Sequence, residues 1–144
     1  MGVIDKVKVT AVTGNLNTVV AGTSTSSASL VVRTELFEPG QLTCEFALLA
    51  ETNTLTLEGR WEVSDDNSTW VDMPVQNNAA VTVLGTGTAG ADSTVTKALP
   101  VPLAASSYNY VRPVVVNRVA TGATADTYSM TLRYIKRYSS KYNG

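Results

Sequence analysis

The chain has 144 residues, a formal net charge of -1 and 44% hydrophobic residues. Only 16% of the residues are charged, against about 25% in ordinary soluble domains, so Thr, Ser, Asn and Ala must cover much of the surface. A chain of this length buries roughly 70% of the surface of its unfolded form, which is enough for a hydrophobic core. A weakly charged surface is easily dehydrated and suits a protein that packs against neighbours, although an ordinary Thr-rich β domain has the same composition.

The residue types exclude several kinds of chemistry. The sequence contains no histidine, which excludes Ser-His-Asp and Cys-His nucleophilic sites. Cys44 is the only cysteine, so no intramolecular disulfide is possible, and its apolar surroundings predict a buried thiol. No stretch approaches the ~20 apolar residues of a membrane span, and the start of the chain has no signal-peptide pattern. We therefore expect a non-enzymatic protein without cofactor, metal or membrane partner, made in a cytoplasm.

Alternating apolar and polar residues, many of them β-branched, predict strands along the whole chain and no helix longer than one short turn, for which residues 100–107 have room. In chain order, the predicted strands cover residues 6–13, 29–36, 42–50, 55–63, 68–73, 79–84, 94–98, 108–119 and 127–137. About eight to ten short strands at this spacing predict an all-β fold, a single jelly-roll-like β-sandwich. One domain is expected over residues 1–144, with a loose basic tail over about 138–144.

Several details refine this pattern. Glu38-Pro39-Gly40 predicts a tight turn, and Asp65-Asp66-Asn67 predicts a hairpin turn. Pro113 lies inside a predicted strand, which places it at a sheet edge or a bulge. Residues 42–50 are apolar enough for a strand buried on both faces, whereas residues 55–63 alternate as a strand with one buried face.

The apolar phases of these strands predict the hydrophobic core. It is expected to contain Val7 or Val9, Leu30, Val32, Phe46, Leu48, Leu57, Trp61, Val63, Val83, Val115, Met130 and Leu132.

Charge is unevenly distributed. Nine acidic residues and one base, Arg60, lie between Glu35 and Asp72, whereas six bases and one acid lie from Arg112 to the end. This asymmetry predicts a dipolar surface that orients docking, unless the two regions pair within one sheet. Six dispersed bases and an isoelectric point near 5.3 do not indicate nucleic-acid binding. Basic and aromatic residues near the C-terminus predict a partner-binding segment, namely Arg133, Lys136, Arg137, Tyr138, Lys141 and Tyr142.

Two further residue groups leave other functions open. Asp65 and Asp66 could support glycoside hydrolysis, or bind calcium together with Asn67, but a turn-forming role explains them better because adjacent side chains point apart. Trp61 and Trp70 flank one hairpin, and at least one is expected to anchor the core. An exposed aromatic pair would instead indicate a carbohydrate-binding or host-attachment module.

The hairpin over residues 61–73, the Val-rich strand over 110–116 and the closing strand over 128–134 together resemble small virion proteins of tailed bacteriophages. Within that group they are most similar to capsid decoration, or cement, proteins, and the resemblance covers about residues 55–137. It implies a structural virion protein on the capsid surface that binds the major capsid protein, bridges neighbouring subunits and self-associates as a trimer. A phage tail or connector component is an alternative of the same class.

Overall fold

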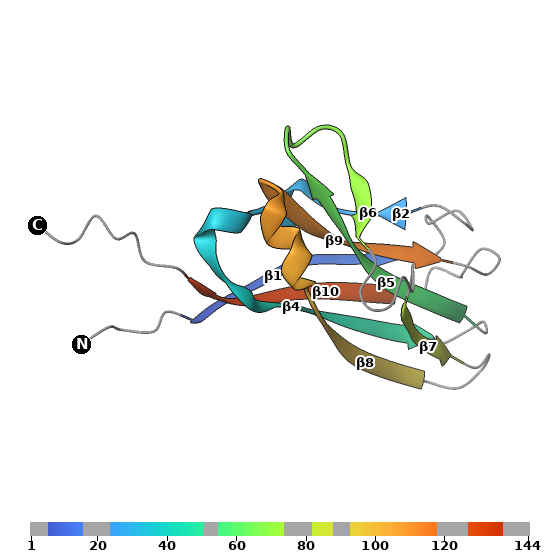
Figure 1. Cartoon of the computed structure of the whole chain (residues 1–144). Coiled ribbons are helices and arrows are strands. Elements are labelled where there is room, and N and C mark those ends of the chain that lie inside the picture. The colour runs from blue at the N-terminus through green and yellow to red at the C-terminus, as the bar shows by residue number, and fades with distance from the viewer. Residues whose placement is uncertain are drawn as a thin grey trace, which may run out of the picture.

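The computed structural model describes residues 6–15, 24–50, 55–73, 82–87, 93–117 and 127–136, which form two antiparallel β-sheets packed face to face (Figure 1). Sheet A contains, in spatial order, β1 (Lys6–Asn15), β10 (Thr127–Lys136), β4 (Phe37–Ala50) and β8 (Ser93–Pro100). Sheet B has β9 (Tyr110–Asn117) and β5 (Leu55–Ser64) at its centre. Beside β9 lie β2 (Ser24–Thr25) and β3 (Val32–Arg33), and beside β5 lie β6 (Val71–Met73) and β7 (Thr82–Gly87). Three short 3-10 helices connect strands: η2 (Ala28–Leu30), η3 (Thr34–Leu36) and η4 (Leu103–Ser107).

The strand order is that of a jelly roll. If β2 with β3, and β6 with β7, are each counted as one strand position, sheet A has the order 1-8-3-6 and sheet B the order 2-7-4-5. Each strand of sheet A except the last one, β10, is therefore followed in the chain by a strand of sheet B, as two interlocked Greek keys require. The prediction of an all-β, jelly-roll-like sandwich is confirmed.

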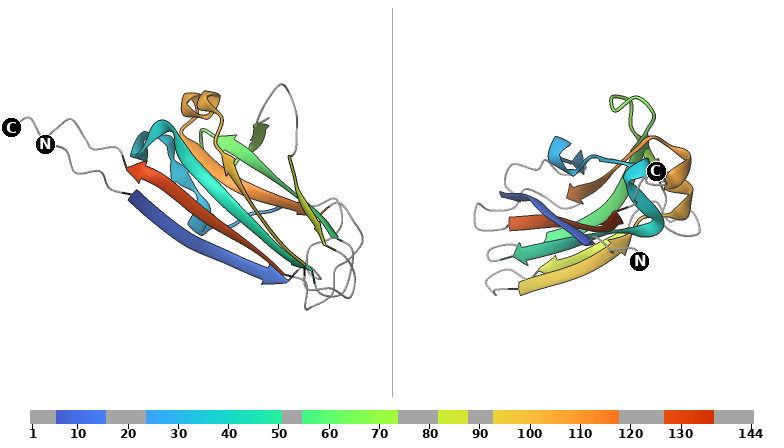
Figure 2. Two further views of the ribbon diagram at one scale, coloured as in Figure 1. Left: turned by 90° about the horizontal axis from the view of Figure 1, so that it is seen from below. Right: turned by 90° about the vertical axis from the view of Figure 1, so that its left-hand side faces the viewer.

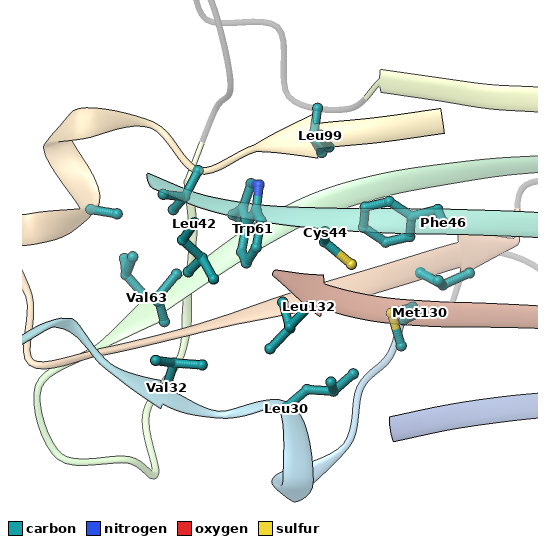
Figure 3. Close-up of a cluster of buried hydrophobic side chains, with 14 of the residues drawn as sticks. Leu30, Val32, Leu42, Cys44, Phe46, Trp61, Val63, Leu99, Met130 and Leu132 are labelled. Atoms are coloured by element: carbon teal, nitrogen blue, oxygen red, sulfur yellow. The ribbon is translucent and has the colours of Figure 1, made fainter. Parts of the chain in front are cut away.

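The hydrophobic core lies between the two sheets (Figure 3). Eight predicted core residues are buried: Leu30, Val32, Phe46, Trp61, Val63, Val115, Met130 and Leu132. Val9 packs against them and is partly buried, whereas the side chains of Leu48, Leu57 and Val83 lie outside the described residues. Trp61 is fully buried, and its indole Nε1 donates a hydrogen bond to the Pro100 carbonyl at 3.2 Å.

The predicted strand over residues 29–36 is wrong. Only β3 is extended there, between the 3-10 helices η2 and η3. Ser27 explains the first part of the difference, because its hydroxyl accepts a hydrogen bond from the Ser29 backbone N–H at 3.3 Å and so caps η2. Short polar side chains that bond to the nearby backbone compete with strand pairing in this way.

The predicted tight turn at Glu38-Pro39-Gly40 is also wrong, because these residues lie within β4. The register of β4 against β10 shifts between the pairs Tyr134–Leu42 and Lys136–Phe37. The shift leaves more residues on β4 than on β10, so the proline and glycine occupy a bulge, where a missing N–H is tolerated.

Pro113 occupies a gap in pairing rather than the end of a sheet. Its strand, β9, is central: it pairs with β5 on one side, and with β3 and β2 on the other. Those two short strands pair with residues 110–111 and 115–116, so residues 112–114 have no strand partner on that side within the described residues. Proline therefore removes no ladder hydrogen bond here.

The strand over residues 42–50 is buried on one face where its side chains are described, not on both. Leu42, Cys44 and Phe46 are buried, whereas the alternating Thr43 and Glu45 are only partly buried. The side chains at these alternate positions point to the outer face of sheet A, which no second layer covers among the described residues.

The hairpin between β5 and β6 is organised by Asp66. Its Oδ1 accepts hydrogen bonds from the backbone N–H groups of Ser68 at 2.9 Å and Thr69 at 2.7 Å, and from the Ser64 hydroxyl at 2.9 Å. Asn67 has a φ of 58°, the left-handed conformation that asparagine tolerates. The predicted hairpin turn is confirmed.

These hydrogen bonds, led by the one from the Thr69 backbone, hold the pKa of Asp66 well below its usual value. A depressed folded-state pKa stabilises the protein above the unfolded pKa of about 3.9, and this contribution is lost as the pH falls below that value. We expect Asp66→Asn to remove this part of the acid sensitivity, measured as unfolding midpoints between pH 2 and pH 6. An unchanged pH profile in the variant would show that the hairpin does not depend on the carboxylate.

Candidate functional site

Of the predicted partner-binding residues, the structure describes two. Arg133 and Lys136 are exposed near the C-terminal end of β10. The others lie outside the described residues: Arg137, Tyr138, Lys141 and Tyr142. The partner-binding role of this segment therefore stays a prediction. The structure does describe the surface around Arg133.

Arg133 lines a hollow of about 360 Å³ on the outer face of sheet A. Figure 2 shows the four strands of this sheet side by side, with β1 at its margin. The hollow, here called the basic groove, is lined by residues of all four strands: Lys6, Val7, Lys8, Gln41, Thr43, Glu45, Ala98, Arg133, Tyr134 and Ile135. The period-two pattern explains most of this lining, because Leu42, Cys44 and Leu132 point inward and their neighbours on each strand point outward.

Strand pairing concentrates positive charge in the basic groove. Lys8 stands directly opposite Arg133 across the β1–β10 pair, and Lys6 lies two residues away on the same face. Like charges directly opposite each other on a sheet are destabilising. Arg133 is relieved from its other side by Glu45, whose carboxylate accepts a hydrogen bond from Arg133 Nε at 2.5 Å. The groove thus holds three cations against one carboxylate.

Sequence reasoning placed Arg133 at a docking surface but missed Lys6 and Lys8. The available signal was their position on the polar phase of the first strand. What could not be read from the sequence was that the first strand pairs with the last one, which brings all three cations together.

The uneven charge distribution is partly neutralised within the fold. Two acids of the acidic middle region pair with two bases of the basic C-terminal region: Glu45 with Arg133, and Glu62 with Arg112. Pairing between the two regions, the alternative to a purely dipolar surface, therefore occurs.

A second charged cluster lies on the outer face of sheet B, and its charges pair with one another. Glu62 is only 6% exposed, and it accepts hydrogen bonds from Arg112 Nε at 2.8 Å and pairs with Arg112 Nη2 at 2.7 Å. Arg60 lies between Glu62 and Asp72, at 3.6 and 3.3 Å. The Arg112 guanidinium sits 4.1 Å from the centre of the Trp70 ring. Two cations face two carboxylates here, so the cluster stabilises the β5–β6–β9 face and offers no excess charge to a ligand.

This arrangement weighs against a sugar-stacking platform of Trp61 and Trp70. Trp61 is fully buried, which confirms the expected core anchor. One face of Trp70 is covered by Arg112. The two indoles do not form an exposed pair.

Two further reactive groups, the Cys44 thiol and the Asp66 carboxylate, are buried or already bonded within the fold. Cys44 is buried as expected, and burial raises the pKa of its thiol far above the usual value. The Asp66 carboxylate is used by its own hairpin. Within the described ranges, no three His, Cys, Asp or Glu side chains are placed to hold a metal ion, and no helix is long and apolar enough to cross a membrane.

No protein-family model matches the sequence, and no curated protein matches it. Among solved structures, the chain is similar to one from infectious bursal disease virus, Gx strain, at 13% identity and a TM-score of 0.48, covering 96% of this chain and 33% of that one. It is also similar to a chain of the T13 particle of the same virus, at 14% identity and a TM-score of 0.41, covering 92% and 31%. A third similarity is to a protein of the disulfide-linked pili that form Bacillus endospore appendages, at 11% identity and a TM-score of 0.39, covering 93% and 91%.

The chain spans about a third of the length of the viral chains that it matches. All three TM-scores lie below 0.5, and the jelly-roll assignment rests on the strand order of this chain alone.

Proposed function

We propose that this chain is a structural virion protein, a cement or decoration protein that binds the outside of a bacteriophage capsid and bridges neighbouring subunits. The observation that carries the proposal is the outer face of sheet A. Beyond the basic groove, the outward side chains described on β4, β8 and β10 are short and uncharged: Ala47, Thr96, Thr127, Ser129 and Thr131.

Such a face is well suited to being covered by another protein. Short side chains lose little rotamer entropy when they are covered, and the absence of charge avoids a large desolvation cost. Binding energy then comes from many modest contacts, which add when each copy touches several shell subunits. The jelly-roll fold agrees with this role by analogy, since viral capsid domains use it, but lectins and cupins use it as well.

The partner in this proposal is the major capsid protein, and copies of the chain associate as trimers. The basic segment from Arg133 to Tyr142 supplies long-range attraction to acidic patches on the shell. Salt screens such attraction with a Debye length of about 8 Å at physiological strength.

A lysine introduced in the middle of the outer face of sheet A should abolish binding to particles that lack the protein. We expect Thr131→Lys to do so without unfolding the protein, because the side chain points outward and leaves the core intact. Val71→Lys is the matched control, since Val71 is 54% exposed on sheet B. Binding is measured by co-sedimentation with the particles, and equal binding of both variants would contradict the assignment of this face.

Removal of residues 139–144, combined with Lys136→Glu and Arg137→Glu, should leave the fold intact and weaken particle binding. The lost charges reduce the attraction to the shell, so binding of this variant should depend less on salt than that of the unmodified protein. Co-sedimentation across a salt series measures both effects. Unchanged occupancy would remove the tail from the mechanism.

A further inference from the structure

We propose that β1 is a docking edge for an extended acidic segment of the partner protein, which adds to sheet A as a further strand. The inference rests on the proposed function only for the identity of the partner. It names the chemistry that the basic groove recognises: carboxylates at alternate positions of a β-strand.

The first step is the position of β1. It is the terminal strand of sheet A, and among the described residues it pairs with one strand, β10 (Figure 2). Its opposite side therefore presents backbone N–H and C=O groups that can pair with an incoming strand. The strand has 10 residues, and its register against β10 is regular from Lys6 to Thr10, the part that carries the two lysines, before it shifts between Thr10 and Val12.

The second step is the charge beside this edge. Lys6 and Lys8 are both exposed and point to the same outer face, because alternate residues of a strand share a face. Within the described part of the chain, neither ammonium group has an ion-pair partner. Residues directly opposite each other on paired strands have Cβ atoms about 4.5–5.5 Å apart, so carboxylates two residues apart on an added strand would meet both lysines.

The third step is the repulsion that the groove contains. Lys8 faces Arg133 across β1 and β10, and Glu45 offsets only the arginine. An acidic strand would relieve this repulsion from the open side. Lysines on an edge strand also discourage pairing with neutral or basic strands, so the same charges select against other partners.

An acidic peptide fits the groove better than a nucleic acid does. The described lining contains only three cations, and the Glu45 carboxylate among them would repel phosphates.

The test uses the purified full-length chain and two terminally blocked, fluorescent peptides of about ten residues and identical composition. One alternates Glu with Thr, and the other carries its glutamates in adjacent pairs separated by two threonines. No two glutamates of the second peptide are two residues apart, so only the alternating peptide presents carboxylates to both lysines at once. We expect it to bind at least about tenfold more tightly at low salt, as measured by fluorescence anisotropy, because exposed ion pairs add up to about 1 kcal/mol each.

Lys6→Glu combined with Lys8→Glu should weaken binding of the alternating peptide about tenfold or more. Arg33→Glu is the control, because Arg33 is an exposed base on β3 of the other sheet. Circular dichroism verifies that all three proteins remain folded.

Equal binding of the two peptides, or no binding at millimolar concentration, would overturn the inference. Equal effects of the lysine and Arg33 variants would overturn it as well. So would lysine-dependent binding of single-stranded DNA in preference to the alternating peptide. Self-association that is lost in the lysine variant would make a second copy the occupant, and would also overturn it. Peptide binding is measured without particles, so a failure here is separate from a failure to bind capsids.

Discussion

Replacing Trp61 with alanine is expected to lower the free energy of unfolding by about 3–5 kcal/mol. The side chain is fully buried between the two sheets, and its indole N–H satisfies the Pro100 carbonyl on β8 of the opposite sheet (Figure 3). Truncation would leave a large cavity at the centre of the core and a carbonyl without its partner. Urea unfolding followed by circular dichroism measures the change.

Trp61→Phe and Trp70→Ala are the companion variants. The phenylalanine variant keeps most of the volume but loses the hydrogen bond, so its cost should be smaller, about 1–3 kcal/mol. Trp70 is only partly buried and has the Arg112 guanidinium over its ring, so its truncation should cost less than that of Trp61. Equal costs at Trp61 and Trp70 would contradict the assignment of Trp61 as the core anchor.

Replacing Glu62 with alanine is expected to cost roughly 3 kcal/mol, because it leaves two guanidinium groups close together without their shared carboxylate. The side chains of Arg60 and Arg112 are 16% and 23% exposed, so water screens part of the repulsion between the two guanidinium groups but not all of it. The Arg60 Nε is buried without a hydrogen-bond partner, which makes its charge more dependent on the neighbouring carboxylates.

Replacing both Glu62 and Arg112 with methionine should recover much of this loss, since well-packed apolar residues often substitute for a buried ion pair at little cost. Glu35→Gln is the control: its pair with Arg33 is exposed and should contribute less than about 1 kcal/mol. A Glu62 variant that is no less stable than the Glu35 variant would show that the cluster on sheet B does not hold the β5–β6–β9 face together.

The strands with the strongest period-two alternation were predictable. Residues 55–63 and 127–137 alternate cleanly, and they correspond closely to β5 and β10. Trp61 belongs to the buried phase of such a strand, and its size made a core position the best prediction. The jelly-roll class followed from the number and spacing of strands rather than from any single motif.

Other features depend on contacts between distant segments, which the pattern of one segment does not contain. Residues 29–36 are apolar enough for a strand, but two 3-10 helices, the first of them capped by Ser27, leave only β3 extended. Pro39 and Gly40 are strong turn formers, yet pairing with β10 carries them into a bulge. Glu62 lies on the polar phase of β5, and it is buried only because Arg60 and Arg112 meet above it.

The basic groove shows the same limit. Lys6 and Arg133 stand at opposite ends of the sequence, and only the pairing of β1 with β10 joins them. Of the predicted docking segment, Arg133 lines that groove and Lys136 lies on the same strand, β10. The remaining residues of the segment lie outside the described part of the chain.

The position and copy number of this protein in virus particles test the central claim most directly. Electron cryomicroscopy of purified particles, combined with quantitative mass spectrometry, measures both. The proposed function predicts density for the jelly roll on the outside of the shell at every equivalent capsomer position, in hundreds of copies, with the outer face of sheet A against the shell. A few copies confined to the tail or connector, or absence from the particle, would contradict it.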